Sequence, residues 1–236
     1  MAMNKQNGNM YPWVTHTWNP LGGECPHRCG YCYARPELLT NPTLKKKYSE
    51  KPFLAASMLK DNLGKGNTIF VQNMGDLFAE EIPTFHIMDI LEHLNKYPDN
   101  TYLLQTKNPR RIANVYMKHL PPKRIIATTL ETDNLTGYKD TKAPSIRERA
   151  EIMESLSQKG ERVIISIEPI MEFRFPLFVA MIRAINPEFV SIGADSKKSG
   201  LPEPSAGQVR ALIAKLGEFT IVRVKDNLKR LNEGVV

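Results

Sequence analysis

Cysteine is scarce in this sequence: the 236 residues contain three, and all three lie in the run from Cys25 to Cys32. Evenly spaced, paired cysteines would indicate a disulfide framework. Three in one short run are instead typical of a metal site in a reducing compartment. We therefore expect a cytoplasmic protein whose cysteines bind metal.

Long apolar runs are absent as well. No stretch approaches the ~20 apolar residues that a membrane-spanning helix requires. Residues 1–10 are polar and carry no apolar core of a signal peptide. These absences predict that no membrane takes part in the function, and they agree with a cytoplasmic location.

Acidic residues are outnumbered, with 25 Asp and Glu against 32 Lys and Arg, which gives a net charge of +7. An excess of this size favours a nucleic acid or a phosphorylated compound as a partner, through counterion release and electrostatic steering. Solvated surface charge explains the excess equally well. No helix-turn-helix, RNP-type or zinc-finger pattern decides between the two.

Glycine-rich dinucleotide-binding patterns, repeats and linkers are also lacking, which argues against a Rossmann-type sheet and for one domain. Apolar strands are expected at 14–18, 67–72, 101–106, 124–129, 162–167, 189–192 and 220–224. Helices are expected at 52–62, from Pro83 (with Phe85, Met88, Leu91 and Leu94 on its apolar side), and at 109–119, 145–158, 175–185 and 207–215. The alternation predicts parallel βαβ units, too few for a closed eight-unit barrel. We expect an α/β fold, an open partial (β/α)6 TIM-like barrel with parallel strands, in one domain over 1–236 with its core at about 13–226.

The cysteines are spaced as C-x3-C-x2-C, with Tyr31 directly before the last one. Four thiolates would occupy every iron of a [4Fe-4S] cluster, whereas three leave one iron open to another ligand. The motif resembles that of the radical S-adenosylmethionine (SAM) enzymes. The resemblance implies that Cys25, Cys29 and Cys32 bind a [4Fe-4S] cluster, that SAM chelates the open iron, and that Tyr31 lies beside the adenine.

A zinc site is the alternative for the same loop, because His27 would complete a Cys3His ligand set. His27 lies between the first two cysteines, two residues from each. That spacing is tighter than zinc ligands usually have, so we prefer the cluster.

Polar residues and glycines follow the expected strands, where ligands bind in parallel sheets and barrels. By the same resemblance they are candidates for binding SAM: Gly75, Asp76, Lys107, Thr129, Glu131, Ser166, Glu168 and Gly193. An acidic loop such as the one ending in Asp76 would receive the amino group of SAM. Helix caps and salt bridges at the rim are the alternative roles for these residues.

Segments outside the cysteine motif carry a more specific resemblance. The runs 15–20, 33–34, 73–78 and 103–109 are similar to a phage-associated three-cysteine-motif family of radical SAM-like proteins (Gp37/Gp68-type), distantly like the spore photoproduct lyases. The similarity covers roughly Trp13 to Asp226. It implies reductive cleavage of SAM to a 5′-deoxyadenosyl radical, with electrons from a flavodoxin- or ferredoxin-type donor.

Our first hypothesis is a radical SAM enzyme that modifies or repairs a nucleic acid base or a nucleotide. A radical SAM enzyme acting on a small metabolite is the alternative within enzymes. A non-catalytic zinc- or iron-binding module that contacts nucleic acid is the alternative outside them. The sequence selects no catalytic residue beyond the cofactor ligands.

Overall fold

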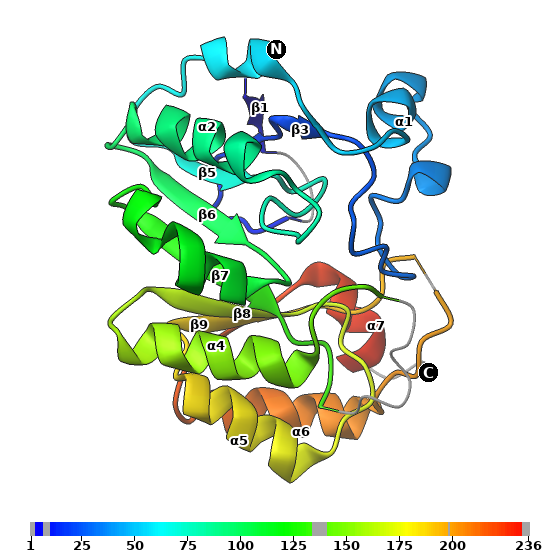
Figure 1. Cartoon of the computed structure of the whole chain (residues 1–236). Helices are drawn as coiled ribbons and strands as arrows, with labels where there is room; N and C mark the ends of the chain where they lie inside the picture. The colour runs from blue at the N-terminus through cyan, green and yellow to red at the C-terminus, as the bar shows by residue number, and fades with distance from the viewer. Residues whose placement is uncertain (1–2, 7–9, 134–140, 198, 233–236) are drawn as a thin grey trace.

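The structure is a computed structural model that describes residues 3–6, 10–133, 141–197 and 199–232 (Figure 1). The main sheet of this described part contains seven parallel strands: β2 (His16–Trp18), β5 (Thr68–Val71), β6 (Thr101–Gln105), β7 (Arg124–Thr129), β8 (Val163–Ile167), β9 (Phe189–Ile192) and β10 (Ile221–Val224). Strand β1 (Asn4–Lys5) runs antiparallel to β2 at one edge, and β10 forms the other edge. The sheet is therefore open, and the predicted α/β fold with parallel strands is confirmed.

The described helices are α1 (Pro42–Tyr48), α2 (Thr84–Asn95), α3 (Pro109–Arg111), α4 (Ile146–Gln158), α5 (Phe175–Ile185), α6 (Ala206–Leu216) and α7 (Lys229–Asn232). Helices α2, α4, α5 and α6, which connect successive parallel strands, cover one side of the sheet (Figure 1). Helix α3 continues as a π-helical turn (Ile112–Tyr116) and a 3-10 turn (Met117–His119). Helices α4, α5 and α6 pack side by side (Figure 1). No helix in the described ranges is long and apolar enough to cross a membrane.

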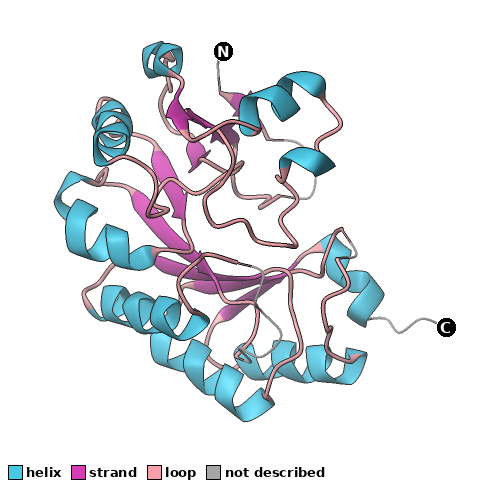
Figure 2. Ribbon diagram, turned by 45° about the vertical axis from the view of Figure 1, so that its right-hand side comes forward, coloured by secondary structure: helices cyan, strands magenta, loops and turns pink. Residues whose placement is uncertain are grey.

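The two faces of the sheet bury different cores, because successive strand residues point to opposite sides. Ile69 and Val71 of β5 belong to the large core beneath the helices, whereas Phe70 between them faces inward. The inner core is small and is completed by Tyr11 and Val14 of the N-terminal segment. This segment covers only part of the inner face, where the loops gather (Figure 2). The remaining space becomes the candidate site.

Two local predictions are wrong. The helix expected at 52–62 is replaced by β4 (Phe53–Leu54), paired with β3 (Leu21–Gly22), and by a 3-10 turn (Ala56–Lys60). Phe85 is 62% exposed and does not belong to the buried side of α2, which Ile87, Ile90, Leu91 and Leu94 form. Those four residues follow the helical i, i+3, i+4, i+7 spacing, and at 100° per residue Phe85 projects from the other side.

Candidate functional site

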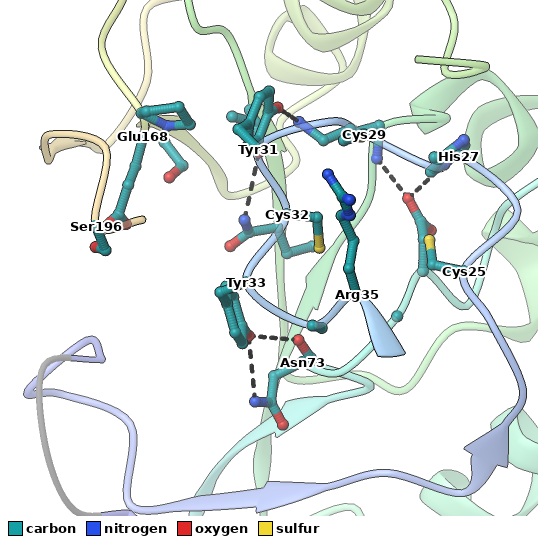
Figure 3. A pocket seen from close by; sticks show the side chains of 18 of the residues that line it. Cys25, His27, Cys29, Tyr31, Cys32, Tyr33, Arg35, Asn73, Glu168 and Ser196 are labelled. Carbon is teal, nitrogen blue, oxygen red and sulfur yellow. Dashed lines mark hydrogen bonds and ion pairs between the residues drawn. The ribbon is translucent and has the colours of Figure 1, made fainter. Parts of the chain in front are cut away.

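All three cysteines line one cavity of about 490 Å³ at the carboxyl ends of the parallel strands. Side chains at or just after the carboxyl ends of the strands from β5 to β10 line the same cavity, and Tyr11 and Phe70 lie at its inner end. Figure 3 shows Glu168 and Ser196 on one side, with Tyr31, Cys32 and Tyr33 on the other. The cysteine loop therefore faces the strand ends across a shared space.

The backbone of the cysteine loop folds through successive turns. The carbonyl of Cys25 accepts a hydrogen bond from the Arg28 N–H at 3.1 Å, and that of Cys29 accepts one from the Cys32 N–H at 3.0 Å. Gly23 enters the loop with φ +88°, and a Cβ there would lie 2.4 Å from the Lys51 carbonyl oxygen. Only glycine combines this conformation with so close a backbone approach.

None of the three cysteines forms a disulfide, and Cys29 is buried while the other two are partly buried. Burial raises the pKa of the Cys25 and Cys32 thiols, and the nearby Asp76 carboxylate raises that of Cys25 further. Within the described residues, no three His, Cys, Asp or Glu side chains converge on a point where one metal ion would bind. In a [4Fe-4S] cluster each thiolate binds a different iron, so three thiols spread along one loop suit a cluster.

His27 and Asp76 form a buried contact of 2.8 Å between Nε2 and Oδ2. Asp76 also accepts hydrogen bonds from the backbone N–H groups of Phe78 at 2.9 Å and Lys107 at 2.7 Å. Burial alone would raise the pKa of Asp76, but His27, the Lys107 N–H and the Thr106 side chain lower it. The carboxylate thus joins the cysteine loop to the loops after β5 and β6, and the His27 ring is turned toward it.

Tyr31, between two of the cysteines, meets a buried charge network. Its hydroxyl donates to the Glu131 carboxylate, which also pairs with Lys107 and, at 3.2 Å, with Arg149. Glu131 and Arg149 are both 0% exposed. Burial alone would raise the pKa of Glu131, but Arg149, Lys107 and Tyr31 together lower it to about 2. Glu131 is therefore ionised, and its carboxylate holds the side chains of Tyr31 and Lys107 in position at the cavity wall.

The wall opposite the cysteine loop carries a second ion pair. Lys225, directly after β10, contacts the carboxylate of Glu168, which follows β8. Asn227 donates from Nδ2 to Glu168 Oε1 at 3.1 Å and to the Ala194 carbonyl at 2.8 Å. Gly193 lies against this group, because a Cβ there would meet the Glu168 carboxylate at 2.8 Å.

The structure brings most of the sequence-predicted residues together. Besides the cysteines, the cavity is lined by Tyr31, Gly75, Asp76, Lys107, Thr129, Ser166 and Glu168. Glu131 and Gly193 lie directly behind residues that line it. The prediction missed Tyr11, Tyr33, Gln105, Arg149, Lys225 and Asn227. Lys225 follows a strand as the predicted residues do, and Arg149 interrupts an apolar helix face, so both carried a sequence signal.

The open parallel barrel has the fold of the radical SAM enzymes. A spore photoproduct lyase variant superposes with a TM-score of 0.63 and 10% identity, over 93% of this chain and 78% of that one. A variant of the same lyase with bound AdoMet and dinucleoside spore photoproduct gives 0.55 and 12%, over 91% and 64%. Streptococcus suis SuiB bound to S-adenosylmethionine gives 0.57 and 10%, over 93% and 52%.

The chain belongs to the family described as protein of unknown function (DUF5131), which matches residues 9–174. No curated protein matches it in sequence. The expected phage-associated family is not confirmed by these matches. The chain spans 64% of the lyase structure that holds its ligands and about half of SuiB.

Proposed function

We propose that this protein is a radical SAM enzyme in which Cys25, Cys29 and Cys32 bind a [4Fe-4S] cluster and SAM binds at the open iron. The observation that carries the proposal is the position of the three cysteines, which line one cavity at the carboxyl ends of the strands. Two of the solved structures with the same fold hold SAM, which is also called AdoMet. The cavity volume of about 490 Å³ lies in the usual range for small-molecule sites.

The chemistry that a bound cluster and SAM would supply is reductive cleavage of the sulfonium to a 5′-deoxyadenosyl radical, which removes a hydrogen atom from the substrate. The residues of the chain position the reactants and exclude water. We assign Tyr31 to the adenine, Thr129 and Ser166 to the ribose hydroxyls, and Lys107 to the SAM carboxylate. Gly75 and Asp76 keep the loop after β5 beside the cysteines.

The substrate we propose is a nucleic acid base or a nucleotide. The net charge of +7 supports this class, as does a fold that in one lyase structure holds a dinucleoside. A small metabolite remains the alternative substrate for the same half-enclosed cavity. We further propose that the chain is a single domain and that it takes electrons from a flavodoxin- or ferredoxin-type donor.

A zinc- or iron-binding nucleic-acid module is the second candidate. Its zinc form needs His27 as a ligand, whereas His27 Nε2 lies 2.8 Å from Asp76. The variant His27→Gln separates the two, because an amide can still donate to Asp76. The cluster hypothesis expects iron and sulfide to be retained, and the zinc hypothesis expects the metal to be lost.

The decisive experiment is anaerobic purification followed by analysis of iron, sulfide and zinc, with 5′-deoxyadenosine release measured under dithionite. We expect about four irons and four sulfides per chain and formation of deoxyadenosine from SAM. Cys25→Ala, Cys29→Ala and Cys32→Ala should each abolish both. Zinc alone, found again after anaerobic reconstitution, would overturn the proposal.

A further inference from the structure

The cavity has two chemically different walls. The predicted cofactor contacts gather at the cysteine loop and at the ends of β5, β6 and β7. The wall from β8, β9 and β10 carries the ion pair between Glu168 and Lys225. Figure 3 shows Glu168 and Ser196 of this wall across from Tyr31 and Tyr33. A radical formed on one side must reach a hydrogen atom on the other. The second wall is therefore the place where a substrate would lie.

The second wall is rigidly built. Asn227 joins Glu168 to the Ala194 carbonyl through two hydrogen bonds of 3.1 and 2.8 Å. Gly193 leaves the room that the group needs, because a Cβ would lie 2.8 Å from the Glu168 carboxylate and 3.0 Å from Asn227 Oδ1. On the inner side, the Lys225 ammonium lies 4.6 Å from the centroid of the Tyr11 ring. The three polar side chains are thus held in one arrangement.

The charge of this wall indicates what it would bind. Glu168 and Lys225 neutralise each other, and their side chains are only 22% and 12% exposed. A phosphate placed on Lys225 would lie beside the Glu168 carboxylate, and a cation on Glu168 would lie beside the ammonium, so in each case repulsion by the neighbouring group would offset the attraction. A neutral group with an N–H next to a C=O can hydrogen-bond to both side chains, because the Glu168 carboxylate accepts from the N–H and the Lys225 ammonium donates to the C=O.

A flat surface lies across the cavity from this pair. Tyr33 is 46% exposed, and its hydroxyl donates to the Asn73 carbonyl at 2.6 Å, which fixes the ring (Figure 3). Aromatic rings of this kind stack on planar heterocycles. The cavity therefore combines a stacking face with an adjacent donor and acceptor.

We propose that Glu168, Lys225 and Asn227 form a substrate subsite that recognises the N–H and C=O edge of a neutral cyclic amide, such as the uracil ring. This inference rests on the proposed function, since it assigns the second wall of the same cavity. It moves Glu168 and Gly193 from the cofactor to the substrate side. Lys225 and Glu168 contact the substrate, and Gly193 acts as a positioning residue through Glu168.

The test is a calorimetric titration of the anaerobically reconstituted protein, in the presence of SAM, with uridine. Matched probes are N3-methyluridine, which lacks the N–H, and inorganic phosphate. We expect uridine to bind at least tenfold more tightly than N3-methyluridine, and phosphate not to compete with it. Glu168→Gln and Lys225→Met should each weaken uridine binding at least tenfold.

Lys229→Met is the matched control, because Lys229 is a nearby lysine whose side chain is 66% exposed. It should leave the uridine affinity unchanged. Circular dichroism checks that the variants are folded, and iron and sulfide are measured on each preparation. The titration is repeated on cluster-free protein. If no cluster forms, the proposed function is refuted, while uridine binding to the cluster-free protein still tests the substrate subsite. Equal binding of uridine and N3-methyluridine, no uridine binding in either form, or unchanged affinity in folded Glu168→Gln and Lys225→Met would overturn the inference.

Discussion

Removal of Arg149 tests whether the buried charge network holds the cysteine loop in place. Arg149 comes from α4 and is 0% exposed, as is its partner Glu131. In Arg149→Met the side chain at this position keeps a similar volume, but the Glu131 carboxylate loses its fully buried partner. The carbonyl of Thr129, which Arg149 also contacts, loses a charged donor.

The expected cost follows from the contacts that remain. Breaking a buried ion pair usually costs about 3–5 kcal/mol, because an uncompensated charge is left behind. Lys107 and Tyr31 still contact Glu131, which places the cost near the lower end of that range. Loss of the hydrogen bond to Thr129 adds about 1 kcal/mol. We therefore expect Arg149→Met to lower the free energy of unfolding by about 3–4 kcal/mol.

Urea denaturation of the metal-free protein, followed by circular dichroism, measures this cost. Arg147→Met is the control, since Arg147 lies on the same helix and pairs with Glu151 while its side chain is 83% exposed. It should leave the urea midpoint unchanged. The double variant Arg149→Met/Glu131→Gln should be no less stable than Arg149→Met alone. A loss below about 1 kcal/mol for Arg149→Met, or an additive double-mutant cycle, would refute the reasoning.

Three further predictions concern pH and the cysteine loop. The pKa of Glu131 is lowered to about 2, so the stability that this carboxylate contributes is complete above pH about 4.5 and is lost as the pH falls toward 2. In Glu131→Gln the free energy of unfolding should lack this loss over the same pH range, and the same acid dependence in both proteins would contradict the prediction. Burial raises the pKa of Tyr48 to about 12, so the unfolded chain ionises first and stability falls as the pH rises from 10 to 12; Tyr48→Phe should flatten the alkaline limb of a thermal-melting series. Gly23→Ala should reduce iron content after reconstitution, because its Cβ would lie 2.4 Å from a backbone oxygen. The control Gly66→Ala, where φ is +72° and the Cβ would meet open space, should retain iron, and equal iron content in the two variants would contradict the role of Gly23 in shaping the loop.

Regular elements could be predicted where one local pattern decided the structure. β7 and β9 begin and end where expected, since each is a continuous run rich in β-branched residues that becomes buried on both faces. Helix α5 also has the expected bounds, with a proline in its first turn. The segment 52–62 could not be predicted in this way. Its backbone pairs with the segment that precedes the cysteine loop, as in the 2.8 Å bond from the Ala55 N–H to the Pro20 carbonyl, and so its structure depends on a partner distant in sequence.

The residues of the candidate site likewise fall into those that a local sequence pattern predicts and those that depend on distant contacts. Residues at the end of a strand or directly after it, such as Thr129 and Glu168, could be predicted because the sheet topology brings them to one edge. Tyr11 could not, since it precedes the first parallel strand and reaches the cavity by packing inside the sheet. Its hydroxyl donates to Gln105 Oε1 at 2.8 Å across 94 residues of sequence. Only a three-dimensional account of the inner core reveals that contact.

The cysteine loop is attached to the sheet through side chains that do not depend on a metal. His27 contacts Asp76 at the end of β5, and Tyr31 contacts Glu131 after β7. The first contact is buried and the second is partly buried, and both end on carboxylates held by further donors, an arrangement that holds the loop in position. These contacts use only side chains of the protein, and the core beneath the helices contains no residue of the cysteine loop. It follows that a variant without the proposed cluster should keep the barrel folded, while loss of Arg149 should weaken the barrel and the cysteine loop together.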